Sequence, residues 1–242
     1  MFRLFFVYDA MATKKSSFAA LCIFVLLSLI EVIPLAFGIE TLHPFVKPLL
    51  IPALAATALL ELLPGCRGPL VAWLAAGLFL HTAGDVLLLF DGFPCFAAGL
   101  GAFLLGHVCY LVILINGLGA LKGWKELLCI LVPLAVSGTL PGLFNLHGAM
   151  AAAIGIYAFT LMYVVSAGVI RVIRGQRWAW KVIAGGLLFL ISDSFIALSS
   201  FAGIDFGLRH ALTMGTYLPA EFLLVSAMTC GILRNQSRSE ID

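Results

Sequence analysis

The sequence is poor in charged residues. Asp, Glu, Lys and Arg make up 11% of the 242 residues, whereas 62% are hydrophobic and the mean hydropathy is +1.12. A water-soluble domain needs about a quarter of its residues charged to cover its surface. The composition therefore excludes a soluble globular protein. It also predicts no nucleic-acid partner, because the net charge is only +2 and the basic residues lie mainly in short connections.

Several catalytic and metal-binding patterns are also missing. The cysteines form no C-x-x-C pair and have no regular spacing, so neither a disulfide framework nor a zinc ribbon is predicted. There is no G-x-S-x-G elbow, and Ser137 lacks the preceding glycine of a rhomboid-type nucleophile. We therefore expect no serine hydrolase chemistry, and we expect neither a metal ion nor another cofactor.

Long apolar runs dominate what is present. One bilayer crossing needs about 20 consecutive apolar residues. Charges, glycines and prolines divide the chain into eight such runs, so we predict an all-α membrane protein with a single transmembrane domain over residues 1–242. The predicted spans are residues 18–38, 44–62, 69–90, 93–116, 126–144, 148–170, 179–201 and 212–233.

Basic residues give the orientation of this eight-helix bundle. All but two of the 14 Lys and Arg residues fall on one side of the predicted membrane, and the other side holds only Lys47 and Arg209. Cytoplasmic connections carry the excess of Lys and Arg. Both termini are therefore predicted to be cytoplasmic, as fits a multi-pass protein of a bacterial inner membrane.

Two parts of the chain have a similar pattern of residues. The run around Asp85 resembles the run around Asp193, and these aspartates lie 108 positions apart. Tyr110 and Tyr217, in the spans that follow, lie 107 positions apart. This spacing is consistent with two parallel four-helix halves that arose by duplication.

Few ionisable side chains lie inside the predicted spans. A charged group in the hydrocarbon region costs a few kcal/mol, and such residues usually face the bundle interior and have a function. At a rise of 1.5 Å per residue, several of them fall in the middle-to-outer layer of the bilayer. We therefore predict that the ionisable residues of the spans share one cavity. The set is Glu31, Lys47, His81, Asp85, His107, Asp193 and Glu221.

Helical spacing places further polar groups on the same faces. Four carboxylates facing one ammonium in a low-dielectric site cannot all ionise. A protonated carboxyl beside an ionised one is the arrangement that general acid/base catalysis uses. The pairs that share a helix face are His81 with Asp85, Tyr217 with Glu221, and His107 with Tyr110.

Other interpretations of these residues stay open at this point. A single intramembrane Asp or His is as readily a helix-packing hydrogen-bonder. An intramembrane aspartyl protease also uses two Asp residues, although its G-x-G-D is here Thr82-Ala83-Gly84-Asp85. A metal-dependent lipid or amide hydrolase of the ceramidase type needs three His, of which only His81 and His107 lie inside spans. A carboxylate network also suits a proton-coupled transporter of a small solute or lipid.

Five short motifs occur in order along the chain. They are Lys47-Pro48, Gly84-Asp85, Phe103-Leu-Leu-Gly-His107-Val-Cys-Tyr110, Leu188-Phe-Leu-Ile-Ser192-Asp193-Ser194 and Thr216-Tyr217-Leu-Pro-Ala220-Glu221. Together they resemble the YhhN/lysoplasmalogenase family of eight-span membrane proteins. Where that family usually has Ala-Gln in the last motif, this chain has Ala-Glu. The resemblance implies a membrane hydrolase that cleaves the vinyl-ether bond of a lysoplasmalogen, giving a fatty aldehyde and glycerophospho-ethanolamine or -choline.

That activity agrees with the carboxylates found above. Protonation of a vinyl ether gives an oxocarbenium ion, the cation that glycosidases stabilise with a pair of carboxyl groups. We expect Asp85 and Asp193 to be the catalytic pair, one donating the proton and the other activating water. Lys47 would hold the phosphate of the lysophospholipid as a point charge. The residues expected to orient the pair or the water are His81, His107, Tyr110, Ser192, Tyr217 and Glu221.

Overall fold

The chain folds as a bundle of long helices. The computed structural model describes the backbone of residues 2–66, 68–204 and 206–239, and the side chains of 14–66, 68–204 and 206–236. Within these ranges there are eight α-helices and no strand, and each helix is long and apolar enough to cross a membrane. The predicted all-α, eight-span membrane protein is therefore confirmed.

The helix bounds agree with the predicted spans except at some ends. The first and last helices extend beyond the predicted 18–38 and 212–233, because a helix keeps its backbone hydrogen bonds after its apolar run ends. Three residues of the Lys/Arg count (Arg3, Arg67 and Arg238) lie outside the described side chains. The elements are α1 (Phe2–Ala36), α2 (His43–Leu62), α3 (Pro69–Leu87), α4 (Phe93–Ile115), α5 (Trp124–Leu143), α6 (Gly148–Ile173), the 3-10 turn η1 (Arg177–Ala179), α7 (Trp180–Ala202) and α8 (Arg209–Ser239).

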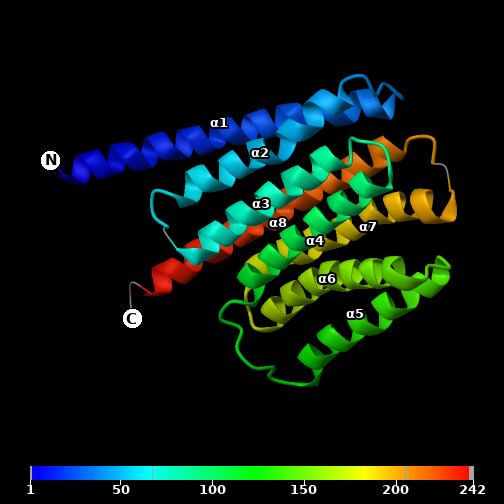
Figure 1. The fold of residues 1–242 in the computed structure, drawn as a ribbon. Helices are drawn as coiled ribbons and strands as arrows, with labels where there is room; N and C mark the ends of the chain where they lie inside the picture. Colours follow the sequence, from blue (N-terminus) through cyan, green and yellow to red (C-terminus); the bar gives the residue numbers. More distant parts are fainter. Residues whose placement is uncertain (1, 67, 205, 240–242) are drawn as a thin grey trace.

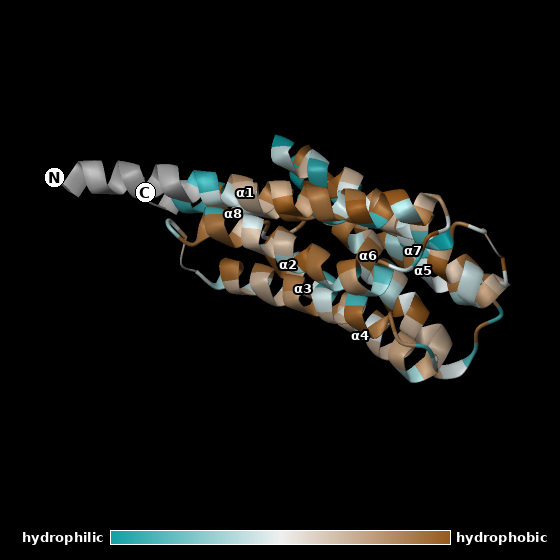
Figure 2. Cartoon of the chain, turned by 90° about the horizontal axis from the view of Figure 1, so that it is seen from above, coloured by the Kyte–Doolittle hydropathy of each residue, from teal (hydrophilic) through white to brown (hydrophobic). Residues whose placement is uncertain are grey.

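Local signals set several of these ends. Proline lies in the first turn of α2, α3 and α4, where its missing N–H costs no hydrogen bond (Pro44, Pro69 and Pro94). Gly203 ends α7 with a φ of +66°, a left-handed conformation that favours glycine. Between such ends the helices are apolar along most of their length, as the brown colouring in Figure 2 shows.

Helices that follow one another in the chain pack side by side, except for α4 and α5. The α8 helix lies in the interior of the bundle against α1, α2, α3, α4 and α7, whereas α5 lies at the edge and packs on α6 (Figure 1). The start of α1 and the end of α8 lie at one end of the bundle, which we call the basic end. The opposite end, where α3 and α7 finish, is called the outer end.

Packing in the two halves of the chain is similar. The contacts of α1 with α2, α2 with α3 and α3 with α4 recur as α5 with α6, α6 with α7 and α7 with α8. The contact of α2 with α8 likewise matches that of α6 with α4. Two parallel four-helix halves would produce this pattern. The duplication itself stays a prediction.

One buried arginine connects α6 to the end of α4. Arg171 is 3% exposed, and its guanidinium donates to the carbonyl oxygens of Leu114 at 2.5 Å and Asn116 at 2.7 Å. It also donates to the side chain of Gln176 and lies over the Trp178 ring. The last carbonyls of a helix have no partner within that helix, so Arg171 supplies donors that α4 lacks.

Replacing this arginine is expected to destabilise the bundle. In Arg171→Met the terminal carbonyls of α4 lose charged donors, which costs about 3 kcal/mol of unfolding free energy. The measurement is the Tm of the purified protein in detergent, with the exposed Arg177→Met as the matched control. An equal Tm for the two variants would contradict this role of Arg171.

Candidate active site

A cavity of about 260 Å³ lies toward the outer end of the bundle. Side chains from α2 to α8 line it, and most of them are apolar. Its polar lining includes five residues predicted from the sequence. These are Lys47, Asp85, Ser192, Asp193 and Tyr217. The structure thus brings the aspartates of α3 and α7 to the same cavity.

Asp85 is held by two groups from other helices. It is 2% exposed, and its Oδ2 accepts a hydrogen bond from the hydroxyl of Tyr217 at 2.8 Å. Its Oδ1 lies 3.8 Å from Nζ of Lys47, which reaches the cavity from the first turns of α2. Asp85 therefore lies beside a buried cation.

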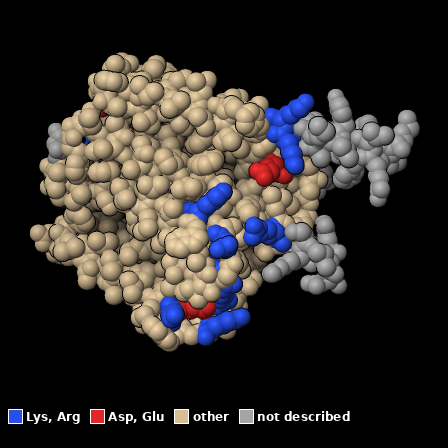
Figure 3. Space-filling model, turned by 180° about the vertical axis from the view of Figure 1, so that it is seen from behind, with Lys and Arg blue, Asp and Glu red and all other residues tan. Residues whose placement is uncertain are grey.

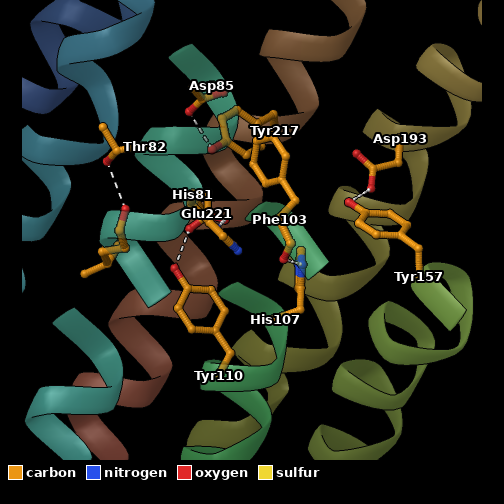
Figure 4. A network of polar contacts seen from close by, with 11 residues as sticks. His81, Thr82, Asp85, Phe103, His107, Tyr110, Tyr157, Asp193, Tyr217 and Glu221 are labelled. Carbon is orange, nitrogen blue, oxygen red and sulfur yellow. Dashed lines mark hydrogen bonds and ion pairs between the residues drawn. The ribbon is translucent and has the colours of Figure 1, made fainter. Parts of the chain in front are cut away.

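Asp193 has a different partner. The hydroxyl of Tyr157 in α6 donates to Oδ2 of Asp193 at 2.6 Å, as Figure 4 shows. Tyr157 also lines the cavity, and it was not among the residues predicted from the sequence. A tyrosine hydroxyl deep in an apolar span was the signal that would have found it. The neighbouring Ser192 donates to the backbone carbonyl of Thr213 at 3.1 Å, so its hydroxyl connects α7 to α8.

A second polar cluster lies next to this cavity. Glu221 is fully buried, its Oε1 lies 2.5 Å from Nδ1 of His81, and its Oε2 accepts from the hydroxyl of Tyr110 at 2.9 Å (Figure 4). Neither these three residues nor His107 lines the cavity. The prediction of one cavity for the whole set is therefore wrong. The i, i+4 spacing places His81 on the same face of α3 as Asp85, but about 6 Å nearer the basic end.

Aromatic rings separate the two clusters. Phe189 of α7 is 1% exposed, and its ring centroid lies 4.5 Å from that of His107, 5.4 Å from Tyr217 and 5.9 Å from His81. Phe103 of α4 also packs on His81 and Phe189. The cavity and the Glu221 cluster are thus neighbours across a wall of aromatic side chains.

The two core histidines are fixed through Nδ1. His107 donates to the carbonyl of Phe103 at 2.8 Å, and its ring centroid lies 4.8 Å from that of His81. Nε2 of each ring is buried and has no hydrogen-bond partner among the described residues. Among the side chains that the structure describes, no three His, Cys, Asp or Glu residues are arranged to hold a metal ion. That no metal or other cofactor is needed stays a prediction.

Glu31 lies away from the cavity. Its Oε1 is 2.5 Å from Nδ1 of His43, the first residue of α2, and the His43 ring lies 5.0 Å from that of His210 in the first turn of α8. The prediction that Glu31 shares the cavity with Asp85 and Asp193 is therefore wrong. Depth in the membrane was similar, but α1 packs on α2 and α8 and does not reach the cavity.

Glycines allow α3 and α4 to approach closely beside the site. A Cβ on Gly106 would collide with Cδ2 of the His81 ring, and a Cβ on Gly77 would lie 2.7 Å from the Tyr110 ring. Small residues at such crossings let the backbones of transmembrane helices come together. The glycines therefore leave room for the side chains that hold Glu221.

The fold and this cavity define an integral, multi-pass membrane protein with carboxyl groups in a largely apolar intramembrane cavity. The chain belongs to the YhhN family, whose model matches residues 42–228, from the loop before α2 into α8. This match confirms the resemblance found in the sequence. Comparisons with curated proteins and with solved structures give no match.

The glycine contacts give a test of the packing around Glu221. Gly106→Ala places a methyl group against the His81 ring, which must move, so we expect a loss of about 1–3 kcal/mol of unfolding free energy. Gly101→Ala, in the same helix, is the control because its Cβ meets open space. Thermal unfolding in detergent measures both. A lower Tm for Gly101→Ala than for Gly106→Ala would contradict the close contact between Gly106 and His81.

Proposed function

We propose that this protein is a membrane hydrolase that cleaves the vinyl-ether bond of lysoplasmalogens, using Asp85 and Asp193 as an acid/base pair. The observation that carries the proposal is that both aspartates line one largely apolar cavity. Membership of the YhhN family agrees with this class of activity. The substrate and the roles of the residues are the parts that we propose.

The cavity suits a lipid with one fatty chain. Apolar side chains from α4, α5, α6 and α7 form much of its wall, including Phe96, Leu140, Phe144 and Ile154. Apolar surface of this kind binds a hydrocarbon chain by removing it from water. Lys47 is 8% exposed and lines the cavity beside Asp85, and its ammonium group faces the head group in the proposed complex.

The surroundings of the two aspartates suggest different roles. The Lys47 ammonium beside Asp85 favours an ionised carboxylate there. Asp193 has a tyrosine hydroxyl on Oδ2 and no ion pair with a described side chain. We therefore assign Asp193 as the proton donor and Asp85 as the base.

The reaction then balances without another reactant. Asp193 donates its proton to the β-carbon of the vinyl ether, and the α-carbon becomes an oxocarbenium ion. Asp85 takes a proton from water as the oxygen of that water attacks the α-carbon, which gives a hemiacetal. Asp85 returns its proton to the leaving glycerol oxygen, and Asp193 takes the proton of the hemiacetal hydroxyl. The products are a fatty aldehyde and glycerophospho-ethanolamine or -choline. Asp193 is again protonated and Asp85 is again ionised.

The remaining predicted residues, together with Tyr157, act as positioning residues in this proposal. Tyr217 and Tyr157 each hold one oxygen of a catalytic aspartate, and the other oxygen, which in Asp85 faces Lys47, is the one that transfers the proton. His81, Tyr110 and Glu221 form a buried network on the other side of Phe189 and support α3, α4 and α8. General acid/base catalysis requires such fixed geometry, since the donor must lie within hydrogen-bond reach of its target.

The proposal predicts that both aspartates are needed for aldehyde release. In Asp85→Asn and Asp193→Asn the shape of the side chain is kept but the acid is lost, so we expect each kcat to fall by about 10²–10⁴-fold. The measurement follows aldehyde from lysoplasmenyl-ethanolamine with purified protein in detergent. Asp91→Asn, an exposed change in the loop after α3, is the matched control and should keep full activity.

Two further measurements separate this proposal from the other interpretations. A saturated alkyl-ether analogue has no double bond to protonate, so it should release no product. Full activity in both Asn variants would refute the carboxylate mechanism. Absence of aldehyde release by the unchanged protein, together with proton-driven solute flux in liposomes, would instead identify a carrier.

A further inference from the structure

A long groove opens near the basic end of the bundle, away from the cavity described above. It has a volume of about 810 Å³ and is bounded by α1, α2 and α8, with the first turn of α7 at its mouth. From Arg234 at that mouth to Phe222, the groove extends 12 residues along α8, which is about 18 Å. That length is more than half of the hydrocarbon thickness of a bilayer.

Charge is concentrated at the mouth of this groove. Lys14 of α1, Lys181 of α7 and Arg234 of α8 converge there, with Glu61 of α2 as the acidic side chain of the lining. Lys14 and Lys181 are exposed, and neither forms an ion pair with another described side chain. Figure 3 shows that Lys and Arg gather at this end of the molecule, whereas most of the same face carries no charge.

The deeper part of the groove is apolar except for hydroxyl groups. Leu21, Leu54 and Val225 line it, and Phe222 at the far end stacks on Phe24. Ser17 donates to the backbone carbonyl of Thr57 at 3.0 Å, which uses that hydroxyl in joining α1 to α2.

Thr229 differs from the other groove hydroxyls. Its side chain lines the groove and is 4% exposed, and its Oγ1 is buried with no hydrogen-bond partner in the part of the chain that the structure describes. A buried hydroxyl without a partner is costly, so such a group usually has a ligand or a water. This atom lies within two turns of the basic mouth, at the depth expected for the ester region of a phospholipid.

We propose that this groove binds an anionic phospholipid of the leaflet at the basic end, with the phosphate at Lys14, Lys181 and Arg234 and an acyl chain along α8. The cations supply charge complementarity for the head group. The apolar walls suit the chain, and Thr229 supplies a hydrogen-bond donor for an ester carbonyl. Basic pockets between transmembrane helices on the cytoplasmic side are typical sites for such lipids. The proposal does not depend on the hydrolase activity.

The test is native mass spectrometry of the full-length protein with equal amounts of phosphatidylglycerol and phosphatidylcholine of identical acyl chains. We expect phosphatidylglycerol to be retained preferentially. Each cation near the membrane surface contributes about five-fold to the binding of an anionic lipid, so Lys14→Gln/Lys181→Gln should bind it roughly 30-fold more weakly. Lys122→Gln/Lys125→Gln removes the same charge from the same end of the bundle and should retain the lipid.

A second variant keeps the charge and changes only the buried hydroxyl. Thr229→Val should weaken phosphatidylglycerol binding about five-fold with no change in Tm greater than a few degrees. Equal retention of the two lipids, or equal loss in both double-lysine variants, would overturn the proposal. Displacement of the lipid by millimolar inorganic phosphate alone would point to a soluble phosphate compound. A mass of two chains that Lys14→Gln/Lys181→Gln reduces to one would point to a dimer contact.

Discussion

Hydrocarbon offers no hydrogen bonds, so every acidic group buried in this bundle depends on a donor from another helix. Tyr217 donates a hydrogen bond to Asp85, and Tyr157 donates one to Asp193. Glu221 accepts from His81 and Tyr110. An unpaired polar group in this environment costs several kcal/mol. These pairs therefore also specify how α3, α4, α6, α7 and α8 are placed around one another, and the geometry of the cavity follows from them.

The polar interior is divided into two parts with different properties. The aspartates are open to a cavity, whereas the Glu221 cluster is closed off behind Phe189 and Phe103. The cavity has space for a ligand, whereas His81, Tyr110 and Glu221 of the closed cluster are fully buried. This separation explains why reaction chemistry is proposed for Asp85 and Asp193 but a positioning role for Glu221, although all three carry carboxyl groups inside the bundle.

The two ends of the molecule present different surfaces to lipids. Near the outer end, the cavity places carboxyl groups among apolar side chains. Near the basic end, the groove has ammonium and guanidinium groups at its mouth and apolar side chains along its deeper part. In the proposed functions, the first end converts a lipid with one chain, and the second retains an anionic lipid without chemistry. The two proposals rest on different residues, so each is tested by its own measurements.

The sequence by itself determined the number of helices and the residues of chemical interest. Apolar length sets membrane crossings, and a buried charge is costly enough that Asp85, Asp193 and Glu221 stand out from their apolar surroundings in the chain. Only the tertiary structure decided which of them meet. Similar depth in the membrane placed Glu31 and Glu221 with the aspartates, but α1 does not reach the cavity, and Glu221, one turn beyond Tyr217 on the same face of α8, lies behind Phe189 and Phe103. Tyr157 was missed because its partner, Asp193, lies 36 residues away in the chain, and no helical spacing connects the two.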